Sequence, residues 1–424
     1  MEQQERIICH IDVNSAFLSW SAAYRVNILG DTVDLRDVPA VVGGDEEARH
    51  GIVLAKSIPA KKFGIQTGEP LFQARRKCPQ LIVVPPDYGL YVDASRQMIR
   101  LLQEISPVVE QYSIDEAWID LSGTQRLYGP PVLTAQRIKD RIRDELGFTV
   151  NVGVSCNKLL AKMASDFQKP DLVHTLFPEE IPSKLWPLPV RELFYVGGAT
   201  EKKLHSMGIN TIGQLAAANP ERLRQQLHQQ GLIIWEFANG RCGNLLDERP
   251  ERSKSYGNST TTRQDVTDTE TAHRILLGLC ETVGMRLRRD GEQGSCVSVV
   301  IRSNTFVNSS QQLQLSIPTN ATMEIYRAAC QVFDQLWDGS TPLRLLGVTM
   351  SNMVDHDEWQ PSLFAEESHE KLARADAAID QIRQRFGENA VIRARLLAEG
   401  KAMTGGASKE RRSGITNPSP DIKD

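Results

Sequence analysis

The stretch from Ser113 to Asp120 constrains the fold most, because it places two adjacent carboxylates, Asp115 and Glu116, in a run of strand-forming residues. Neighbouring side chains on a regular strand point to opposite faces, so these carboxylates converge only beside a turn or a distortion. Another carboxylate, Asp12, follows the apolar start of the chain. The sequence therefore predicts carboxylates at the ends of strands, although a solvated acidic turn would also explain the adjacent pair.

Carboxylates at strand ends meet the requirements of a divalent-metal site. Their oxygens are the hard ligands that Mg²⁺ prefers, and Mg²⁺ also accepts water and substrate phosphates. Two such ions about 3.5–4 Å apart activate a 3′-hydroxyl and stabilise a departing pyrophosphate. The pattern therefore points to phosphoryl transfer.

The chain resembles the Y-family DNA polymerases of the UmuC/DinB type, the translesion enzymes. The resemblance extends from about residue 7 to about residue 400 and rests on strings in the family's order and spacing, at residues 12–17, 113–117, 152–158, 161–162 and 169–170. It implies that Asp12, Asp115 and Glu116 are metal ligands, together with the backbone carbonyl of Val13. The implied cofactor is a pair of Mg²⁺ ions, for which Mn²⁺ is a possible substitute.

Length and pattern predict several domains, since 424 residues are too many for one core. The order strand, helix, strand, strand, helix, strand is the ferredoxin-like arrangement that the resemblance assigns to a palm. We therefore expect an α+β multidomain protein with a small fingers domain, a helix-hairpin-helix thumb and an α/β little finger. The expected segments are palm 1–30 and 81–172, fingers 31–80, thumb 173–245, linker 246–268, little finger 269–355, clamp-binding linker 356–370, C-terminal helix 371–402 and disordered tail 403–424.

Several residues of the N-terminal half are assigned to the nucleotide by the resemblance. Lys169 matches the lysine that binds the incoming triphosphate, although a solvated cation at a helix end is the plainer interpretation. Phe17, on a helix that Asn14 or Ser15 is expected to cap, matches the steric gate against a ribose 2′-hydroxyl; it also suits a core aromatic. Ile58 and Lys61 replace the family's usual Tyr and Arg, so a hydroxyl and a bidentate guanidinium are missing.

Other residues are candidates for DNA contact. Gly197 and Ala199 lie in a Gly-Gly-Ala hairpin resembling the one that binds the DNA backbone in a helix-hairpin-helix, although it could be an ordinary helix–helix turn. In the little finger, the candidate phosphate contacts are the segment from Ser255 to Arg263 and the arginines Arg286, Arg288 and Arg289. The arginine cluster could equally be a solvated helix face.

The segment 360–364 resembles the pentapeptide with which bacterial polymerases bind the sliding clamp. It begins at Gln360 and offers Leu363 and Phe364 as apolar anchors, although Pro361 stands where Leu is usual. The expected partners are primer-template DNA, deoxynucleoside triphosphates and the clamp. The sequence does not reveal whether an accessory mutagenesis subunit or a recombinase filament is needed. We expect a monomer.

Composition excludes some classes of protein. No apolar run approaches the roughly 20 residues of a membrane span, and no secretory signal is recognisable. The seven cysteines are scattered without a C-x-x-C pair, which argues against zinc and disulfides and favours a bacterial cytoplasm, near the nucleoid. The net charge of −4 disfavours tight unaided binding to DNA, so we expect the clamp to supply much of the residence time.

Two alternatives belong to other functional classes. Residues 43–46 read Gly-Gly-Asp-Glu, as in diguanylate cyclases, but Glu47 replaces the expected Phe and nothing in a cyclase explains Asp115 and Glu116. A non-catalytic polymerase relative acting as a DNA-binding scaffold would lose the metal carboxylates, and this chain keeps all three. The sequence therefore predicts a Mg²⁺-dependent, low-fidelity DNA polymerase, with no segment typical of an exonuclease.

Overall fold

The computed structural model describes residues 6–46, 49, 51–242, 246, 253–354 and 367–399. The chain forms two compact units. The first contains the described residues up to Gly43 and from Val53 to Leu246, and the second contains those of 44–52 and of 253–399. No helix among these residues is long and apolar enough to cross a membrane.

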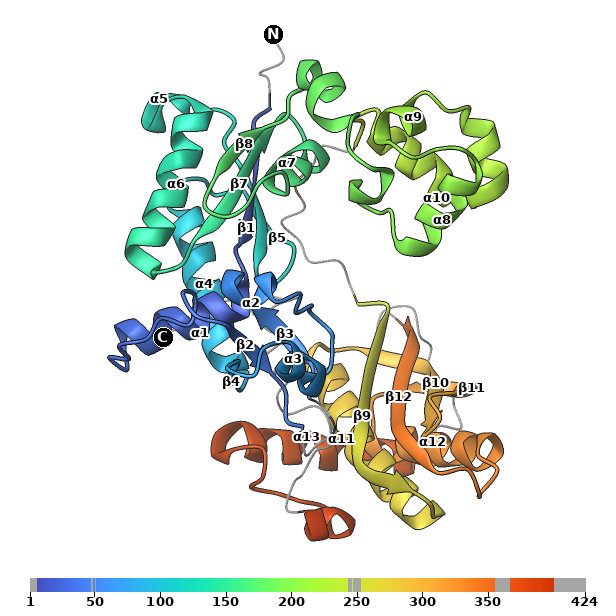
Figure 1. Ribbon diagram of the computed structural model, residues 1–424. Helices are drawn as coiled ribbons and strands as arrows, with labels where there is room; N and C mark the ends of the chain where they lie inside the picture. Colours follow the sequence, from blue (N-terminus) through green and yellow to red (C-terminus); the bar gives the residue numbers. More distant parts are fainter. Residues whose placement is uncertain are drawn as a thin grey trace. The chain divides into compact units, whose positions relative to one another are not determined.

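The palm is a five-stranded sheet with helices on both faces (Figure 1). Its strand order is β5-β6-β1-β7-β8, from β1 (Ile8–Val13), β5 (Val109–Gln111), β6 (Glu116–Asp120), β7 (Val150–Ser155) and β8 (Val173–Thr175). One face packs on α1 (Ala16–Asn27), α4 (Tyr88–Gln103) and α6 (Pro131–Leu146), and the other on α7 (Lys158–Ser165). A short helix, α5 (Gln125–Tyr128), precedes α6.

The order β5-β6-β1-β7 is the expected ferredoxin-like one, so the predicted fold class is confirmed for the palm. β8 adds a fifth strand parallel to β7. Residues 173–175, which we assigned to the thumb, therefore belong to the palm sheet. Their short run carries little apolar signal of its own, and the pairing with β7 decides their place.

The fingers contain a three-stranded sheet of order β3-β2-β4, from β2 (Ala40–Gly43), β3 (Val53–Lys56) and β4 (Ile82–Val84). Two short helices, α2 (Ile58–Lys62) and α3 (Leu71–Lys77), accompany it. The strand β4, which we assigned to the palm, pairs in parallel with β2. Parallel strands need a crossover connection, so the chain must traverse α2 and α3 before this sheet is complete.

The thumb is helical, as predicted, and shares a core with α7 of the palm. Its helices are η1 (Pro178–Glu180), η2 (Ile181–Leu185), η3 (Val190–Glu192), α8 (Gly198–Ser206), α9 (Ile212–Ala216) and α10 (Pro220–Ala238). The backbone of α10 breaks at His228, whose φ is 54°.

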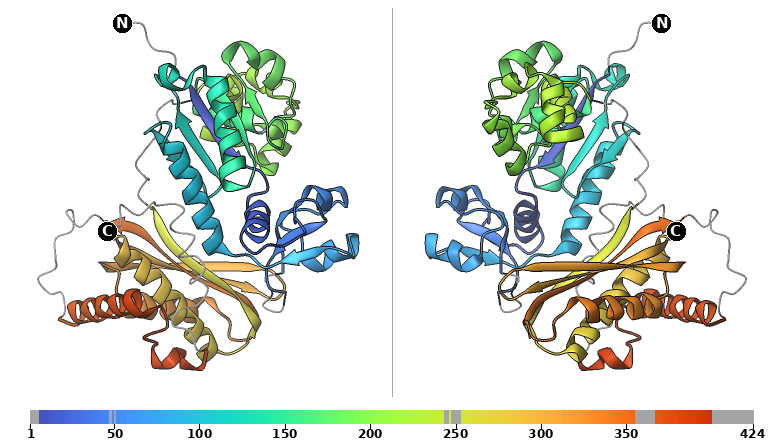
Figure 2. Two further views of the ribbon diagram at one scale, coloured as in Figure 1. Left: turned by 90° about the vertical axis from the view of Figure 1, so that its left-hand side faces the viewer. Right: turned by 90° about the vertical axis from the view of Figure 1, so that its right-hand side faces the viewer.

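The little finger is a four-stranded antiparallel sheet of order β11-β10-β12-β9, with helices on one face (Figure 2). Its elements are β9 (Ser255–Val266), α11 (Thr269–Arg289), β10 (Gln293–Ser303), β11 (Asn308–Thr319), α12 (Thr322–Leu336) and β12 (Leu343–Val354). The predicted linker is wrong from Ser255 onward, because those residues form β9, and β11 was not predicted at all. Both are polar because alternate side chains face away from the helices, which hides the strand pattern.

The C-terminal part packs on α11 and α12 through α13 (Glu367–Phe386) and the short helix η4 (Ala394–Glu399). We predicted one helix over 371–402, but Gly387 has a φ of 96° and ends α13. The predicted clamp motif at Gln360, Leu363 and Phe364, and the tail from residue 403, lie outside the described residues.

Candidate active site

Asp12 and Glu116 lie opposite each other on two central strands of the palm. β1 and β6 are antiparallel, with Asp12 paired with Glu116. Directly opposite residues have Cβ atoms about 4.5–5.5 Å apart. The N–H of Val13 donates a 3.0 Å hydrogen bond to the Asp115 carbonyl oxygen. Strand pairing therefore brings Asp12, Val13, Asp115 and Glu116 to one end of the sheet.

Asp115 lies in the tight connection between β5 and β6. The N–H groups of Tyr112 and Ser113 both donate to the Glu116 carbonyl oxygen, at 3.0 and 3.2 Å. The Ser113 hydroxyl donates to the Asp115 carboxylate at 2.6 Å. The acidic pair thus stands beside a turn, as the alternation of strand side chains requires.

Two lysines face these carboxylates. Lys169 Nζ lies 3.0 Å from Asp12 Oδ2 and 3.0 Å from an oxygen of Asp166. Lys162, on α7, forms an ion pair with Glu116. His10, which is fully buried on β1, has its Nε2 atom 3.3 Å from the same Glu116 oxygen.

The environment shifts the pKa values of Asp12 and Glu116 in opposite directions. Burial raises the pKa of Asp12 to about 6, even though Lys169 opposes the shift. Burial also favours a higher pKa for Glu116, but His10 and Lys162 outweigh it and lower this pKa to about 2. Glu116 is therefore held as a carboxylate, whereas Asp12 depends on nearby positive charge to stay ionised.

The donor set fits magnesium in its chemistry, because carboxylate and carbonyl oxygens meet at one end of two paired strands. The carboxylates are not gathered around one point, however. Among the residues that the structure describes, no three His, Cys, Asp or Glu side chains are grouped closely enough to hold a metal ion. Asp12 faces Lys169, Glu116 faces Lys162 and Asp115 accepts from Ser113, so the metal site stays a prediction.

Phe17 lies in the first turn of α1 and is partly buried. Its ring stacks on Tyr91 with centroids 4.6 Å apart and meets Tyr88 edge-on at 5.9 Å. The helix begins differently from our expectation. Ser15 has a φ of 51° and its side chain makes no capping bond, while the Asn14 amide donates to Thr149 instead. A left-handed residue turns the chain directly from β1 into α1, so side-chain capping was wrongly predicted.

In the fingers, Ile58 and Lys61 lie on the five-residue helix α2. Ser57 caps this helix by accepting from the Ala60 N–H at 3.1 Å. Ile58 is 52% exposed and Lys61 is also exposed. Both side chains are accessible to a ligand, and their role stays a prediction.

In the thumb, Gly197 is the N-cap residue of α8 and Ala199 lies in the first turn. Both are exposed, and a Cβ atom at Gly197 would meet nothing within 4 Å. Amides of a first helical turn lack partners within the helix, which suits binding of a phosphate backbone.

Ser255 is the first residue of β9 and Arg263 lies towards the other end of this strand, and both are exposed. Arg286 lies in the helix layer instead, where it donates to the Gly257 carbonyl oxygen at 3.1 Å and stands over the Tyr256 ring. Arg288 is not available for phosphate, because its buried side chain pairs with Asp376 and Asp380 of α13. The predicted arginine cluster is therefore not a single phosphate-binding surface, because Arg286 and Arg288 contact other groups of the protein.

The contacts of His10 and Lys162 with Glu116 were not predicted from the sequence. His10 is two residues before Asp12 and must share its face of the strand, which is a usable signal. Lys162 is separated from Glu116 by 46 residues, and only the packing of α7 on the sheet brings the two together.

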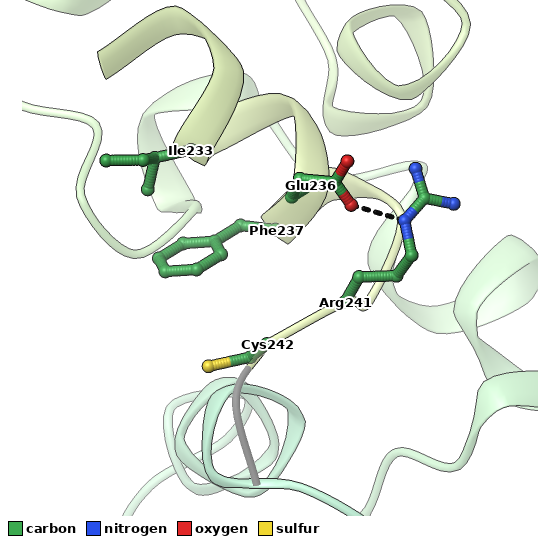
Figure 3. Close-up of a pocket in the computed structure, with 5 residues that line it drawn as sticks. All are labelled: Ile233, Glu236, Phe237, Arg241 and Cys242. Atoms are coloured by element: carbon green, nitrogen blue, oxygen red, sulfur yellow. Dashed lines mark hydrogen bonds and ion pairs between the residues drawn. The ribbon is translucent and has the colours of Figure 1, made fainter. Parts of the chain in front are cut away.

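A hollow of about 390 Å³ lies elsewhere, at the end of α10 in the thumb (Figure 3). It is lined by Ile233, Glu236, Phe237, Arg241 and Cys242. Arg241 forms an ion pair with Glu236 across its rim. The hollow contains none of the predicted site residues.

Comparisons with known proteins cover most of the chain. Residues 11–166 match the impB/mucB/samB family, residues 253–363 its C-terminal domain and residues 178–209 its helix-hairpin-helix motif. DNA polymerase IV of Clostridium acetobutylicum is 44% identical and covers 92% of this chain and 98% of its own. DNA polymerase IV 2 of Bacillus subtilis is 36% identical, with 94% and 97% covered.

Among solved structures, a chimeric Y-family DNA polymerase superposes with a TM-score of 0.69. It covers 82% of this chain and 99% of its own, at 22% identity. This likeness shows the fold, and the palm, fingers, thumb and little finger are its parts.

Proposed function

Because the chain belongs to the impB/mucB/samB family of Y-family DNA polymerases, we propose that it copies damaged templates with low fidelity by two-metal nucleotidyl transfer. It is a DNA-directed DNA polymerase of the DNA polymerase IV type. The observation that carries the proposed chemistry is the pairing of Asp12 with Glu116 across β1 and β6. The Asp115 carbonyl accepts a hydrogen bond from the next residue of β1, and Lys169 forms an ion pair with Asp12.

Asp12, Asp115, Glu116 and the Val13 carbonyl would hold the metal ions of the proposed site. When bound, two Mg²⁺ ions would offset charge on the triphosphate and lower the pKa of the primer 3′-hydroxyl. Lys169 would exchange Asp12 for a phosphate oxygen, since a lysine is a point charge suited to phosphate. Phe17, which stacks on Tyr91, would block a ribose 2′-hydroxyl. The primer supplies the nucleophile, so no side chain needs to.

Low fidelity is proposed from the size of the fingers. Their two helices have only five and seven residues. Ile58 and Lys61 provide neither a hydroxyl nor a guanidinium to the triphosphate side of the pocket. A small domain with few contacts checks the shape of a base pair weakly, and this permits both mismatches and lesions.

For partners, we propose primer-template DNA on the outer face of the little-finger sheet and a bacterial sliding clamp at Gln360, Leu363 and Phe364. We place the protein in the cytoplasm with the nucleoid, in line with its bacterial relatives. Deleting residues 360–364 should reduce clamp-stimulated synthesis while leaving unstimulated synthesis intact. Equal stimulation of both proteins would contradict clamp binding at this segment.

The test is primer extension with Mg²⁺ and four deoxynucleotides, on undamaged and abasic templates. Asp115→Asn should abolish extension, whereas Asp120→Asn, which changes the aspartate at the far end of β6, should retain it. Extension past the abasic site by the unaltered protein establishes lesion bypass. No extension by the unaltered protein, even with clamp, would instead favour a non-catalytic scaffold.

A further inference from the structure

Lys169 lies on a segment that has no regular structure of its own. Residues 166–172 connect the end of α7 to β8, and neither a helix nor a strand includes them. Fixing such backbone costs about 1–2 kcal/mol per residue in conformational entropy. The position of Lys169 beside Asp12 therefore needs contacts from outside the segment.

Asn151, on the strand β7, supplies two of these contacts, and a third hydrogen bond joins it to the last residue of α7. Its side chain is 0% exposed, and the residue pairs directly with Asp12 across β1 and β7. The Asn151 amide nitrogen donates to the carbonyl oxygens of Ser165 at 3.1 Å and Gln168 at 2.6 Å. Its carbonyl oxygen accepts from the Leu172 N–H at 3.4 Å. One buried amide thus binds the segment on both sides of Lys169.

A second anchor acts at Asp171. This residue has a φ of 59°, and its carboxylate lies 2.9 Å from Lys139 Nζ and 3.5 Å from Arg143, both on α6. The Lys139 side chain is 5% exposed and that of Asp171 is 28% exposed, so the lysine end of this ion pair is shielded from water. The pair fixes the segment two residues after Lys169.

We propose that Asn151 and Lys139 are positioning residues, which hold residues 166–172 so that Lys169 reaches the triphosphate site. This inference rests on the proposed function, because it assumes that Lys169 binds the incoming nucleotide. Neither residue touches the nucleotide itself. Their contribution is to reduce the cost of ordering Lys169 when substrate arrives.

The chemistry of position 151 is specific. Only a carboxamide offers two N–H donors and an acceptor on one short side chain. Aspartate has the same shape but would direct an acceptor at the carbonyl oxygens of Ser165 and Gln168, and alanine would remove both the donors and the acceptor. Both replacements should free the segment.

The test compares Asn151→Ala, Lys139→Met and Lys169→Ala, alone and combined, in steady-state incorporation of one deoxynucleotide. Lys169→Ala should raise the nucleotide KM by about tenfold, as expected for a lost charge-assisted bond. Asn151→Ala and Lys139→Met should raise KM several-fold with little change in kcat. In the Lys169→Ala background they should add almost nothing, because they act through Lys169. Full additivity, or an unchanged KM in the single variants, would overturn the proposal.

Asn239→Ala is the matched control, since it removes a thumb amide that donates to the Ala216 and Trp235 carbonyl oxygens. It should lower stability without changing the nucleotide KM. If Asn151→Ala does not fold, Asp171→Asn takes its place, because Asn tolerates a positive φ while losing the ion pair.

Hydrogen exchange separates this inference from the function on which it rests. The Leu172 amide should exchange faster in Asn151→Ala than in the unaltered protein, whatever the protein catalyses. Unchanged exchange would overturn the anchoring even if the protein polymerises. Faster exchange together with an unchanged KM in Lys169→Ala would show that the segment is anchored but that Lys169 does not bind nucleotide, which also overturns the positioning role.

Discussion

The palm and the little finger are both built around a sheet, but one sheet is enclosed and the other is open. Helices cover both faces of the palm, and every residue of β1 and β7 is buried. In the little finger, helices cover one face, and most residues of β11 are exposed. An enclosed sheet fixes a few charged groups in a low-dielectric setting, which suits chemistry. An open sheet offers many weak polar contacts, which suits a long substrate.

Buried charge also has a different task in each region. In the palm, Lys162 and Lys169 face the carboxylates of the proposed site. In the little finger, Glu281 on α11 pairs with Arg383 of α13 and with Arg393, on the helix side of the sheet. In the proposed site, a substrate phosphate would replace Asp12 at Lys169, whereas the buried Glu281 is paired with two arginines of its own domain.

The largest expected effect tests the palm side of this contrast. Glu116→Gln should reduce incorporation by about 10³-fold or more, because an electrostatic contact to the reaction is lost. Glu110→Gln is the control, since Glu110 pairs with Lys158, which lies on α7 as Lys162 does. The side chains of Glu110 and Glu116 are shielded from water to a similar extent. The activity of Glu110→Gln should stay near that of the unaltered protein. Equal losses in both variants, measured by single-nucleotide kinetics, would mean that the ion pairs are structural.

The next effect tests the little finger. Glu281→Gln should destabilise this domain by about 3–5 kcal/mol, because Arg383 is left buried without its carboxylate. Denaturant unfolding of the full chain would measure this change. Asp334→Asn, which breaks the exposed pair with His273, should cost about 1 kcal/mol or less. A small effect of Glu281→Gln would contradict the structural role of the buried cluster.

Phe17→Ala should raise incorporation of ribonucleotides relative to deoxynucleotides on the order of tenfold to a hundredfold, as expected when a steric block is removed. Competition between the two nucleotide classes on one primer measures this ratio. Phe17→Tyr keeps the ring and should keep the discrimination. If Phe17→Ala changes only stability, the residue is a core aromatic that packs on Tyr91.

The smallest effect tests the open sheet. Arg263→Ala should weaken DNA binding a few-fold and lower the salt dependence of the binding constant by about 0.9 in slope, the amount for one phosphate contact. Arg289→Ala should leave the slope unchanged, since Arg289 pairs with Asp290 on the helix side. Salt titrations with duplex DNA would show the difference. Equal slopes for Arg263→Ala and the unaltered protein would remove Arg263 from the DNA surface.

The contrast between the two sheets also explains what could be predicted. The apolar run of β1, the alternating valines of β7 and the periodic helices α11 and α12 were visible because burial leaves a hydrophobic pattern. The alternation predicted a half-buried strand at β7, but every residue of β7 is buried. The strands β9 and β11 were missed because their outward residues are Ser, Thr, Gln and Asn, which also occur in linkers. Their strand character comes from backbone pairing with β12 and β10.

By itself, the sequence determined the fold class, the family and the carboxylates of the proposed site, because these depend on local pattern and ordered motifs. Tertiary structure alone decided which lysines meet Asp12 and Glu116. Lys162 reaches Glu116 across 46 residues, and Asn151 holds the Lys169 segment through bonds to backbone groups, which any sequence would provide. Contacts of this kind depend on how helices pack on a sheet, and no local pattern records them.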